Sequence, residues 1–299
     1  MAVSESRIKT LAKIEELESK GFFNIDVWGE PTYVPLKPGQ VDYFKKKLSS
    51  RIKTRLCNHA LNKFIKRNEK NHQVILKEIF GLEKLQNLKT GAIITSNHFH
   101  PFDSYPIKKM LTKVYGNKKT LHTVVAEYNY AGGTGFYGKI FRNQNTIPIA
   151  QNKEVMIECL KAINYYLTKG DFILVYPEQA LWQNYKKPRP LKEGAYRFAL
   201  KANVPVVACF VTMQDSQYLD DEGIPVQEYT LHILDIIYPK AQLTYKENIE
   251  YMKNENERLM REKYEEVYGE KLTYNTKEKI WYDFVSNNDN NCLDIHNRF

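Results

Sequence analysis

His98 and Asp103 stand five positions apart within residues 97–103, a spacing that can support acid–base chemistry. An alcohol is a poor nucleophile at neutral pH, and an imidazole with a pKa near ~6.5 can take its proton as attack begins. A carboxylate on the other ring nitrogen fixes the tautomer and stabilises the imidazolium. No serine nucleophile is required, and the sequence contains no G-x-S-x-G turn. We therefore expect His98 to act as a general base and Asp103 to orient it.

The placement of this pair bears on its chemistry. Residues 91–95 have the pattern of a buried strand, and Pro101 suits the start of a helix near residues 102–112. On one continuous helix, side chains five residues apart would point to different faces, whereas a loop into a helix lets Asp103 turn back onto His98. Ligands bind at strand ends in α/β folds. The alternative is purely structural: His98 caps a turn and Asp103 caps the helix.

The elements that would position this pair alternate along the chain. Apolar strand patterns occur at residues 91–95, 121–127, 147–149, 172–176, 204–211 and 229–237. Helix patterns occur at residues 5–20, 41–68, 102–112, 153–168, 194–202 and 245–268. Such alternation predicts an α/β fold with a mixed, largely parallel sheet flanked by helices.

This pattern also suggests a domain organisation. We expect a helical extension over residues 1–72, the α/β domain over residues 73–285, and an asparagine-rich flexible tail over residues 286–299. Residues 21–40 carry three of the prolines and read as irregular structure.

Positive charge is concentrated in the extension. Residues 45–70 hold ten basic residues and one acid, so this window matches the +9 net charge of the whole 299-residue chain. The apolar residues of the helix pattern at 41–68 recur at mostly three- and four-residue steps, which predicts a basic amphipathic helix. Such a helix can lie on an anionic membrane surface. The alternative is a helix that packs on the domain with its lysines in solvent. Nucleic acid is a weaker reading because no binding motif accompanies the charge.

Several segments resemble the ordered blocks of a known family. Residues 97–103, Asn-His-x-x-x-x-Asp, resemble the first block of the glycerolipid acyltransferases, the 1-acylglycerol-3-phosphate acyltransferase family. Residues 175–178, Val-Tyr-Pro-Glu, resemble its third block, and residues 204–207, Val-Pro-Val-Val, resemble its fourth. Residues 191–199 are similar to the helix start that lies between those blocks in the family.

The resemblance implies a function and a set of site residues. It implies an O-acyltransferase that moves a fatty-acyl group from acyl-CoA or acyl-carrier protein to a hydroxyl of a lysophospholipid, such as 1-acylglycerol-3-phosphate, in phospholipid biosynthesis. The alternatives are a different hydroxyl acceptor, such as a glycolipid, or a non-catalytic lipid-binding module. In the family the first block is catalytic, and the second and third blocks bind the acceptor phosphate. The substrate-binding residues expected here are Asn97, Arg142, Glu178, Lys192 and Gly194.

Two departures put the phosphate site in doubt. Gln151 stands where the second block usually has an arginine, and Gln-Ala-Leu at residues 179–181 replaces Gly-Thr-Arg of the third block. Gln cannot replace the charge of an arginine on a phosphate. Nearby cations could substitute, and these are Arg142, Lys186, Lys187, Arg189 and Lys192. The alternative for Glu178 itself is a carboxylate that caps a helix or joins an ion pair.

Residues 133–138 form a literal G-x-G-x-x-G. A dinucleotide site needs these glycines directly after a strand and an acid about 20 residues later at the next strand end. Neither condition is met. Residues 128–132 separate the strand pattern from Gly133, and the candidate acid, Glu158, lies in a helix pattern. We expect a mobile loop beside the active site instead.

Composition bounds the remaining possibilities. No cysteine lies in a C-x-x-C pair, so neither a metal site nor a dithiol is indicated, and reduced core cysteines suggest a cytoplasmic location. We expect no metal and no cofactor beyond the acyl thioester substrate. No stretch approaches the ~18–20 apolar residues that span a bilayer. The expected location is therefore peripheral, on the inner face of the membrane.

Overall fold

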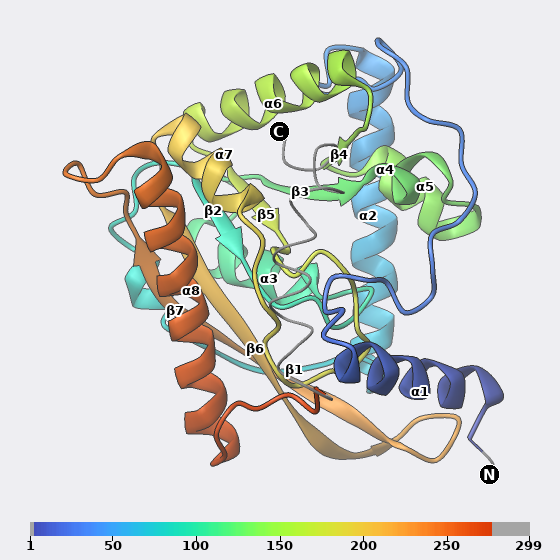
Figure 1. Cartoon of the computed structure of the whole chain (residues 1–299). Coiled ribbons are helices and arrows are strands. Elements are labelled where there is room, and N and C mark those ends of the chain that lie inside the picture. Colours follow the sequence, from blue (N-terminus) through green and yellow to red (C-terminus); the bar gives the residue numbers. More distant parts are fainter. Residues whose placement is uncertain (1–2, 277–299) are drawn as a thin grey trace.

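One seven-stranded mixed sheet organises the described part of the chain, in the strand order β1-β7-β6-β2-β5-β3-β4 (Figure 1). This computed structural model describes residues 3–276. The strands are β1 (Ile75–Phe80), β2 (Ala92–Thr95), β3 (Leu121–Ala126), β4 (Thr146–Ile149), β5 (Phe172–Val175), β6 (Val206–Leu219) and β7 (Pro225–Ile237). The strands β2 to β6 run parallel, and β7 with its parallel neighbour β1 runs the opposite way. The expected α/β class with a mixed, largely parallel sheet is confirmed.

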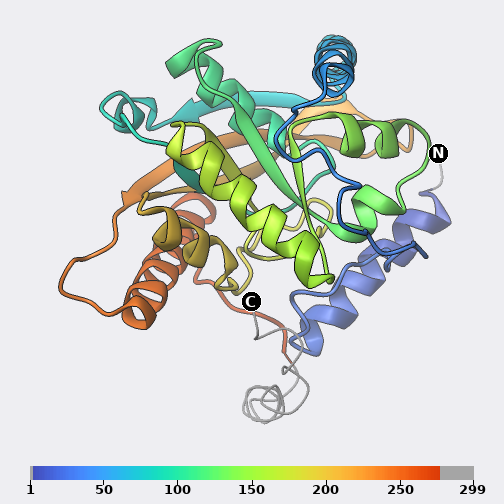
Figure 2. The same ribbon diagram turned by 90° about the horizontal axis from the view of Figure 1, so that it is seen from above.

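The helices cover both faces of this sheet. They are α1 (Glu5–Ser19), α2 (Leu48–Lys70), η1 (Leu82–Leu85), α3 (Ser104–Tyr115), α4 (Glu127–Ala131), α5 (Gly135–Asn143), α6 (Lys153–Thr168), α7 (Gly194–Ala202) and α8 (Tyr245–Tyr268). Helices α6, α7 and α8 lie on one face, while α3 and η1 lie on the other, as the view from above shows (Figure 2). The central strands β2 and β5 are buried at every position because helices cover both of their sides.

Local sequence explains why the best-predicted helices form where they do. In α6 the Asn152 side chain accepts hydrogen bonds from the backbone N–H groups of Glu154 and Val155. In α8 Thr244 and Glu247 form a capping box. The inward residues of α6 recur at three- and four-residue steps and pack in the core on this face of the sheet. The bounds predicted for these helices, and for α7, agree with the structure.

The basic helix predicted over residues 41–68 begins later, at Leu48, and continues to Lys70. The Asp42 carboxylate accepts the backbone N–H groups of Lys46 at 2.9 Å and Lys47 at 3.0 Å. Lys45 has a positive φ of 50°, which lies outside the helical region. These local bonds compete with helix formation and place the start of α2 after them.

Other sequence expectations need correction. The strands predicted at residues 204–211 and 229–237 form a longer hairpin, β6 with β7, and the edge strand β1 was not predicted. The segment around residues 133–138 is no loop, because α5 occupies most of it. The predicted flexible tail at residues 286–299 lies outside the described residues.

Residues of the predicted extension share the core of the α/β domain. Leu36, Val41 and Tyr43 belong to the apolar cluster under α6 and α7. The Tyr43 hydroxyl donates to the backbone oxygen of Pro148 at 2.8 Å. The division at residue 72 stays a prediction. The predicted extension also contacts the surroundings of the His98 loop, because Arg189 donates to the backbone oxygens of both Phe23 and His98.

Candidate active site

The His98 loop follows β2, a central strand of the sheet, and leads into α3. Asn97 fixes the first part of this loop. Its side-chain amide donates to the Val211 backbone oxygen at 3.0 Å, and its side-chain oxygen accepts the Val211 N–H at 2.8 Å. Asn97 is 2% exposed, and these two bonds tie the end of β2 to β6. Its contact with a substrate stays a prediction.

The structure brings His98 and Asp103 together. The Nδ1 atom of His98 lies 2.5 Å from Oδ2 of Asp103, and the Asp103 side chain is 4% exposed. The same Oδ2 accepts the backbone N–H of Phe99 at 3.2 Å. Asp103 occupies the N-cap position of α3, but its side chain makes no capping bond to that helix. The purely structural alternative, in which Asp103 caps α3, therefore does not describe this carboxylate.

Tyr176, directly after β5, completes the support of the pair. Its hydroxyl donates to Oδ1 of Asp103, and its ring stacks on the His98 imidazole with centroids 4.1 Å apart and planes 9° apart. Burial and the neighbouring Asp103 carboxylate raise the pKa of Tyr176 well above its usual value. The hydroxyl therefore stays protonated and remains a donor, and the flat stack fixes the plane of the imidazole.

These contacts define what His98 can do. With its Nδ1 proton donated to an ionised Asp103, the ring is the tautomer whose Nε2 carries a lone pair. Within residues 3–276 no protein group hydrogen-bonds to Nε2, and the His98 side chain is 21% exposed. The arrangement suits a general base whose free nitrogen faces an incoming hydroxyl group.

Two other histidines have different contacts, although Nε2 of His122 also lies 3.7 Å from a carboxylate oxygen of Asp171. His100 receives the Phe102 backbone N–H on Nδ1 at 3.1 Å, and burial lowers the pKa of His100 to about 4. His122 shares the five-residue spacing with Glu127. However, Glu127 accepts the backbone N–H groups of Leu36 and Gln151, and the two side chains do not pair. Spacing alone did not distinguish the His98 pair from the His122 pair.

Glu178 is fully buried beneath the His98 loop. Its Oε2 accepts the backbone N–H of His98 at 3.0 Å and lies 2.7 Å from Nη2 of Arg189, and both side chains are 1% exposed. Arg189 also donates to the backbone oxygens of Phe23 at 2.8 Å and His98 at 3.2 Å. Its guanidinium stacks on Trp182. Glu178 therefore forms the ion pair that the structural alternative described, and its contact with the acceptor stays a prediction.

The remaining predicted substrate-binding residues contact other parts of the chain, and their binding roles stay predictions. Arg142 is exposed, and its guanidinium donates to the backbone oxygens of Tyr130 at 3.2 Å and Gly133 at 2.7 Å. Lys192 and Gly194 are exposed where α7 begins. The Lys192 backbone N–H donates to the Pro177 oxygen at 2.9 Å, so this turn supports the third-block loop through its main chain.

The glycines that were read as a mobile loop serve packing. A Cβ atom on Gly138 would lie 2.1 Å from the Gly133 backbone oxygen. Arg142 holds the same oxygen. The G-x-G-x-x-G pattern therefore marks a close approach between the α4–α5 link and α5.

Reasoning from sequence missed three residues at this site. Tyr176 lies within residues 175–178, which resemble the third block. Its position as an aromatic residue directly after a buried strand could have indicated a role at the site. Arg189 was named only as a possible phosphate ligand, although it is the buried partner of Glu178. Asp26 had no local signal, since it lies on a segment that the distant residues Arg189 and Trp182 hold against the main chain of His98.

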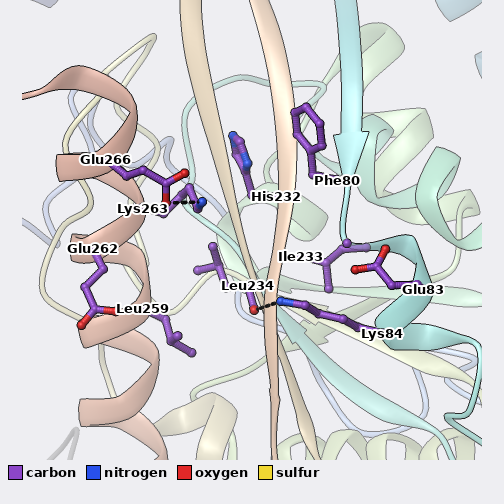
Figure 3. A pocket seen from close by; sticks show the side chains of 11 residues that line it. Phe80, Glu83, Lys84, His232, Ile233, Leu234, Leu259, Glu262, Lys263 and Glu266 are labelled. Carbon is purple, nitrogen blue, oxygen red and sulfur yellow. Dashed lines mark hydrogen bonds and ion pairs between the residues drawn. The ribbon is translucent and has the colours of Figure 1, made fainter.

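One hollow among residues 3–276 lies apart from the His98 loop. A hollow between η1 and α8 is lined by residues including Lys84, His232 and Lys263 (Figure 3). It contains no residue of the His98 loop. In the same range no group of three or more His, Cys, Asp or Glu side chains could hold a metal ion. No helix there is both long enough and apolar enough to cross a membrane.

Comparisons with known proteins place this geometry in context. The family model described as Acyltransferase matches residues 54–212, which include the His98 loop and the Glu178–Arg189 pair. Among solved structures, the chain is similar to the crystal structure of the 1-acyl-sn-glycerophosphate (LPA) acyltransferase PlsC from Thermotoga maritima. That similarity has 18% identity and a TM-score of 0.47, and it covers 77% of this chain and 87% of that one. No curated protein sequence matches the chain.

Proposed function

Because the chain belongs to the acyltransferase family, whose model matches more than half of it, we propose that it transfers a fatty-acyl group from a thioester to a lipid hydroxyl. The donor is acyl-CoA or acyl-carrier protein, and the product is an ester of the kind made in phospholipid biosynthesis. One observation carries this proposal: Asp103 binds His98 Nδ1 at 2.5 Å and leaves Nε2 open.

The reaction follows from that geometry. The acceptor hydroxyl gives its proton to Nε2 as its oxygen attacks the thioester carbonyl. A tetrahedral intermediate forms, and its collapse breaks the C–S bond. The imidazolium then returns the proton to the leaving thiolate, so that the products are an ester and a free thiol. Asp103 stabilises the imidazolium during both proton transfers.

A membrane surface is the proposed place of the reaction. The first half of α2 exposes Leu48, Ile52 and Leu56 at 70%, 52% and 65%, four residues apart on one face. Basic side chains surround this stripe. An apolar stripe within a cationic helix supports binding to an anionic headgroup region. This arrangement favours a peripheral protein on the cytoplasmic face of the membrane.

Aromatic residues link this stripe to the loop that carries His98. Phe136 of α5 packs against Phe64 of α2 with ring centroids 5.1 Å apart. Phe64 in turn lies 5.5 Å from Phe102, which belongs to the His98–Asp103 loop. Phe136 is exposed at 43%. A lipid that enters from the α2 side would therefore meet apolar rings before it reaches His98.

Acyl transfer is tested by thiol release from acyl-CoA and by product mass in an acceptor screen. We expect His98→Ala and Asp103→Asn to lose turnover by about 10²–10⁴-fold. His72→Asn is the matched control, because His72 is exposed, has a positive φ of 55° that Asn tolerates, and lies outside the loop. Full activity in His98→Ala would refute the mechanism. Liposome binding without turnover of any thioester would favour a lipid-binding module.

Membrane binding has its own matched pair of variants. Ile52→Glu should weaken sedimentation with anionic liposomes, since it places a carboxylate within the proposed contact. Ile157→Glu is the control, because Ile157 is exposed at 50%, close to the 52% of Ile52, but lies on α6. Equal liposome binding by both variants would contradict the role of α2.

A further inference from the structure

Residues 23–28 pass over the third-block loop and are anchored there. Nη1 of Arg189 donates to the Phe23 backbone oxygen at 2.8 Å, while Nη2 of the same guanidinium donates to the His98 oxygen at 3.2 Å. Nε1 of Trp182 donates to the Ile25 oxygen at 2.9 Å, and the Trp182 N–H donates to the same His98 oxygen at 3.1 Å. Two buried side chains thus hold this segment against the main chain of His98.

Asp26 follows directly on these anchors. Its Oδ1 accepts the Trp28 backbone N–H at 2.8 Å, which fixes the carboxyl at the turn of the segment. Burial raises the pKa of Asp26, and the nearby His98 imidazole and Arg189 guanidinium lower it in part. Asp26 therefore lies on the segment that Arg189 and Trp182 hold against the main chain of His98, and its side chain is half-buried.

Most of the cations that could hold a phosphate here have other partners. The buried Arg189 guanidinium donates hydrogen bonds to Glu178 and to backbone oxygens. Lys187 lies 2.8 Å from Glu18. Arg142 is bound to the backbone oxygens of the α4–α5 link.

The remaining two lysines lie on other elements. Lys186 sits over the Tyr268 ring of α8, 5.9 Å from its centroid. Lys192 is exposed at the start of α7 and contributes a main-chain contact to the third-block loop. Gln151 and Leu181 stand at the two positions where the family resemblance expects arginine. A phosphate beside His98 would thus meet a carboxyl group and none of the expected guanidinium forks.

We propose that the acceptor is a lipid with neighbouring hydroxyl groups and no phosphate beside the reacting one, and that Asp26 determines this specificity. One hydroxyl gives its proton to His98 Nε2, and its neighbour donates a hydrogen bond to the Asp26 carboxyl. A monoacylglycerol and a monoacyl glycosylglycerol share this diol chemistry. The inference rests on the proposed acyl transfer and names its acceptor class.

The test compares two acceptors that differ only in the phosphate: 1-monoacylglycerol and 1-acylglycerol-3-phosphate with the same chain, each with acyl-CoA. We expect kcat/KM of the full-length protein to be at least about 10-fold higher for monoacylglycerol. Its second hydroxyl donates a hydrogen bond to the Asp26 carboxyl, whereas the phosphate of the other acceptor is repelled by it. A monoacyl glycosylglycerol in a third arm distinguishes a glycerol diol from a sugar diol.

Variants of Asp26 separate recognition from structure. Asp26→Asn keeps the oxygen that binds the Trp28 N–H, and it should lower kcat/KM for monoacylglycerol about 10-fold, mainly through KM, with a smaller change for the phosphate acceptor. Asp26→Lys should shift the preference towards the phosphate acceptor. Glu30→Gln is the control, because Glu30 is an exposed carboxylate on the same stretch, and its preference should match the unmodified protein.

The outcomes distinguish this inference from the proposed function. Equal or better use of 1-acylglycerol-3-phosphate overturns the acceptor class while leaving acyl transfer intact. Equal losses for both acceptors in Asp26→Asn overturn the specificity role, because a structural change does not discriminate between acceptors. Absence of thiol release with every acceptor overturns the proposed function, and the inference with it.

Discussion

Replacing Arg189 by methionine should destabilise the protein strongly. The substitution removes the guanidinium that faces Glu178 at 2.7 Å, in a place where both side chains are 1% exposed. The Glu178 carboxylate would keep two backbone donors, the N–H groups of His98 and of residue 189 itself. It would lose its only side-chain ion-pair partner among the described residues. The backbone oxygens of Phe23 and Ala180 would lose a donor as well.

The size of the loss follows from this environment. Breaking a buried ion pair by removal of one partner costs about 3–5 kcal/mol, because an uncompensated charge stays buried. Each buried carbonyl left without a donor adds up to roughly 1–3 kcal/mol, although contributions that share one side chain do not add fully. We therefore expect the free energy of unfolding to fall by at least about 3 kcal/mol, out of the ~5–15 kcal/mol typical of a domain.

Urea unfolding of matched variants measures this loss. Arg197→Met is the control, since Arg197 forms a 2.7 Å ion pair with Glu193 on the exposed surface of α7. An exposed pair contributes only about 0–1 kcal/mol. The double variant Glu178→Gln with Arg189→Met should recover stability relative to Arg189→Met alone, because the buried charge is gone. A loss below about 1 kcal/mol in Arg189→Met, with a raised KM for a phosphate acceptor, would refute the reasoning and restore Arg189 as a ligand of the substrate.

Three further outcomes are expected. Tyr176→Phe keeps the ring stack but removes a donor to Asp103, and kcat in the thiol-release assay should fall about 10- to 100-fold; unchanged turnover would contradict this role. Gly138→Ala places a methyl against the α4–α5 link and should lower the unfolding free energy by about 1–3 kcal/mol, whereas Gly194→Ala, with open space around it, should not. Burial chiefly lowers the pKa of His232 to about 4. The unfolded chain therefore binds an extra proton at this residue between about pH 6.5 and pH 4. The free energy of unfolding consequently decreases as the pH is lowered through that window. His232→Gln should reduce this slope in urea titrations by up to ~1.4 kcal/mol per pH unit, and an unaltered slope would exclude His232 as its source.

Much of the fold could be predicted because its signals are local. The bounds of α6 follow from an asparagine cap, a strict apolar period and a terminal glycine, all within 20 residues of one another. Strand β1 was missed because its pattern is weak: Lys77 and Glu78 interrupt the apolar residues, as suits an edge strand. The start of α2 depends on the side chain of Asp42, a competition that periodicity does not register.

The residues of the candidate site likewise differ in how far local sequence signals predict their contacts. The spacing of His98 and Asp103 was not sufficient to predict their pairing, because His122 and Glu127 share it without pairing. The position of His98 between a buried strand pattern and Pro101, together with the family-like blocks downstream, favoured the first pair. The pairing of Glu178 with Arg189 lies in one loop as well, but a run of cations offered several equivalent partners. Asp26 could not have been found from the sequence, because its segment is held near the His98 loop only by hydrogen bonds to the distant residues Trp182 and Arg189.

The docking of residues 23–28 also sets an order of assembly during synthesis. Phe23 and Arg189, which share a hydrogen bond, are separated by 166 positions in the chain. At roughly 5–20 residues per second, this separation corresponds to an interval on the order of 10 to 30 seconds. The His98 loop therefore cannot take its final shape on the ribosome until Arg189 has emerged. Until then residues 23–28 lack the hydrogen bond to Arg189 and stay accessible to chaperones.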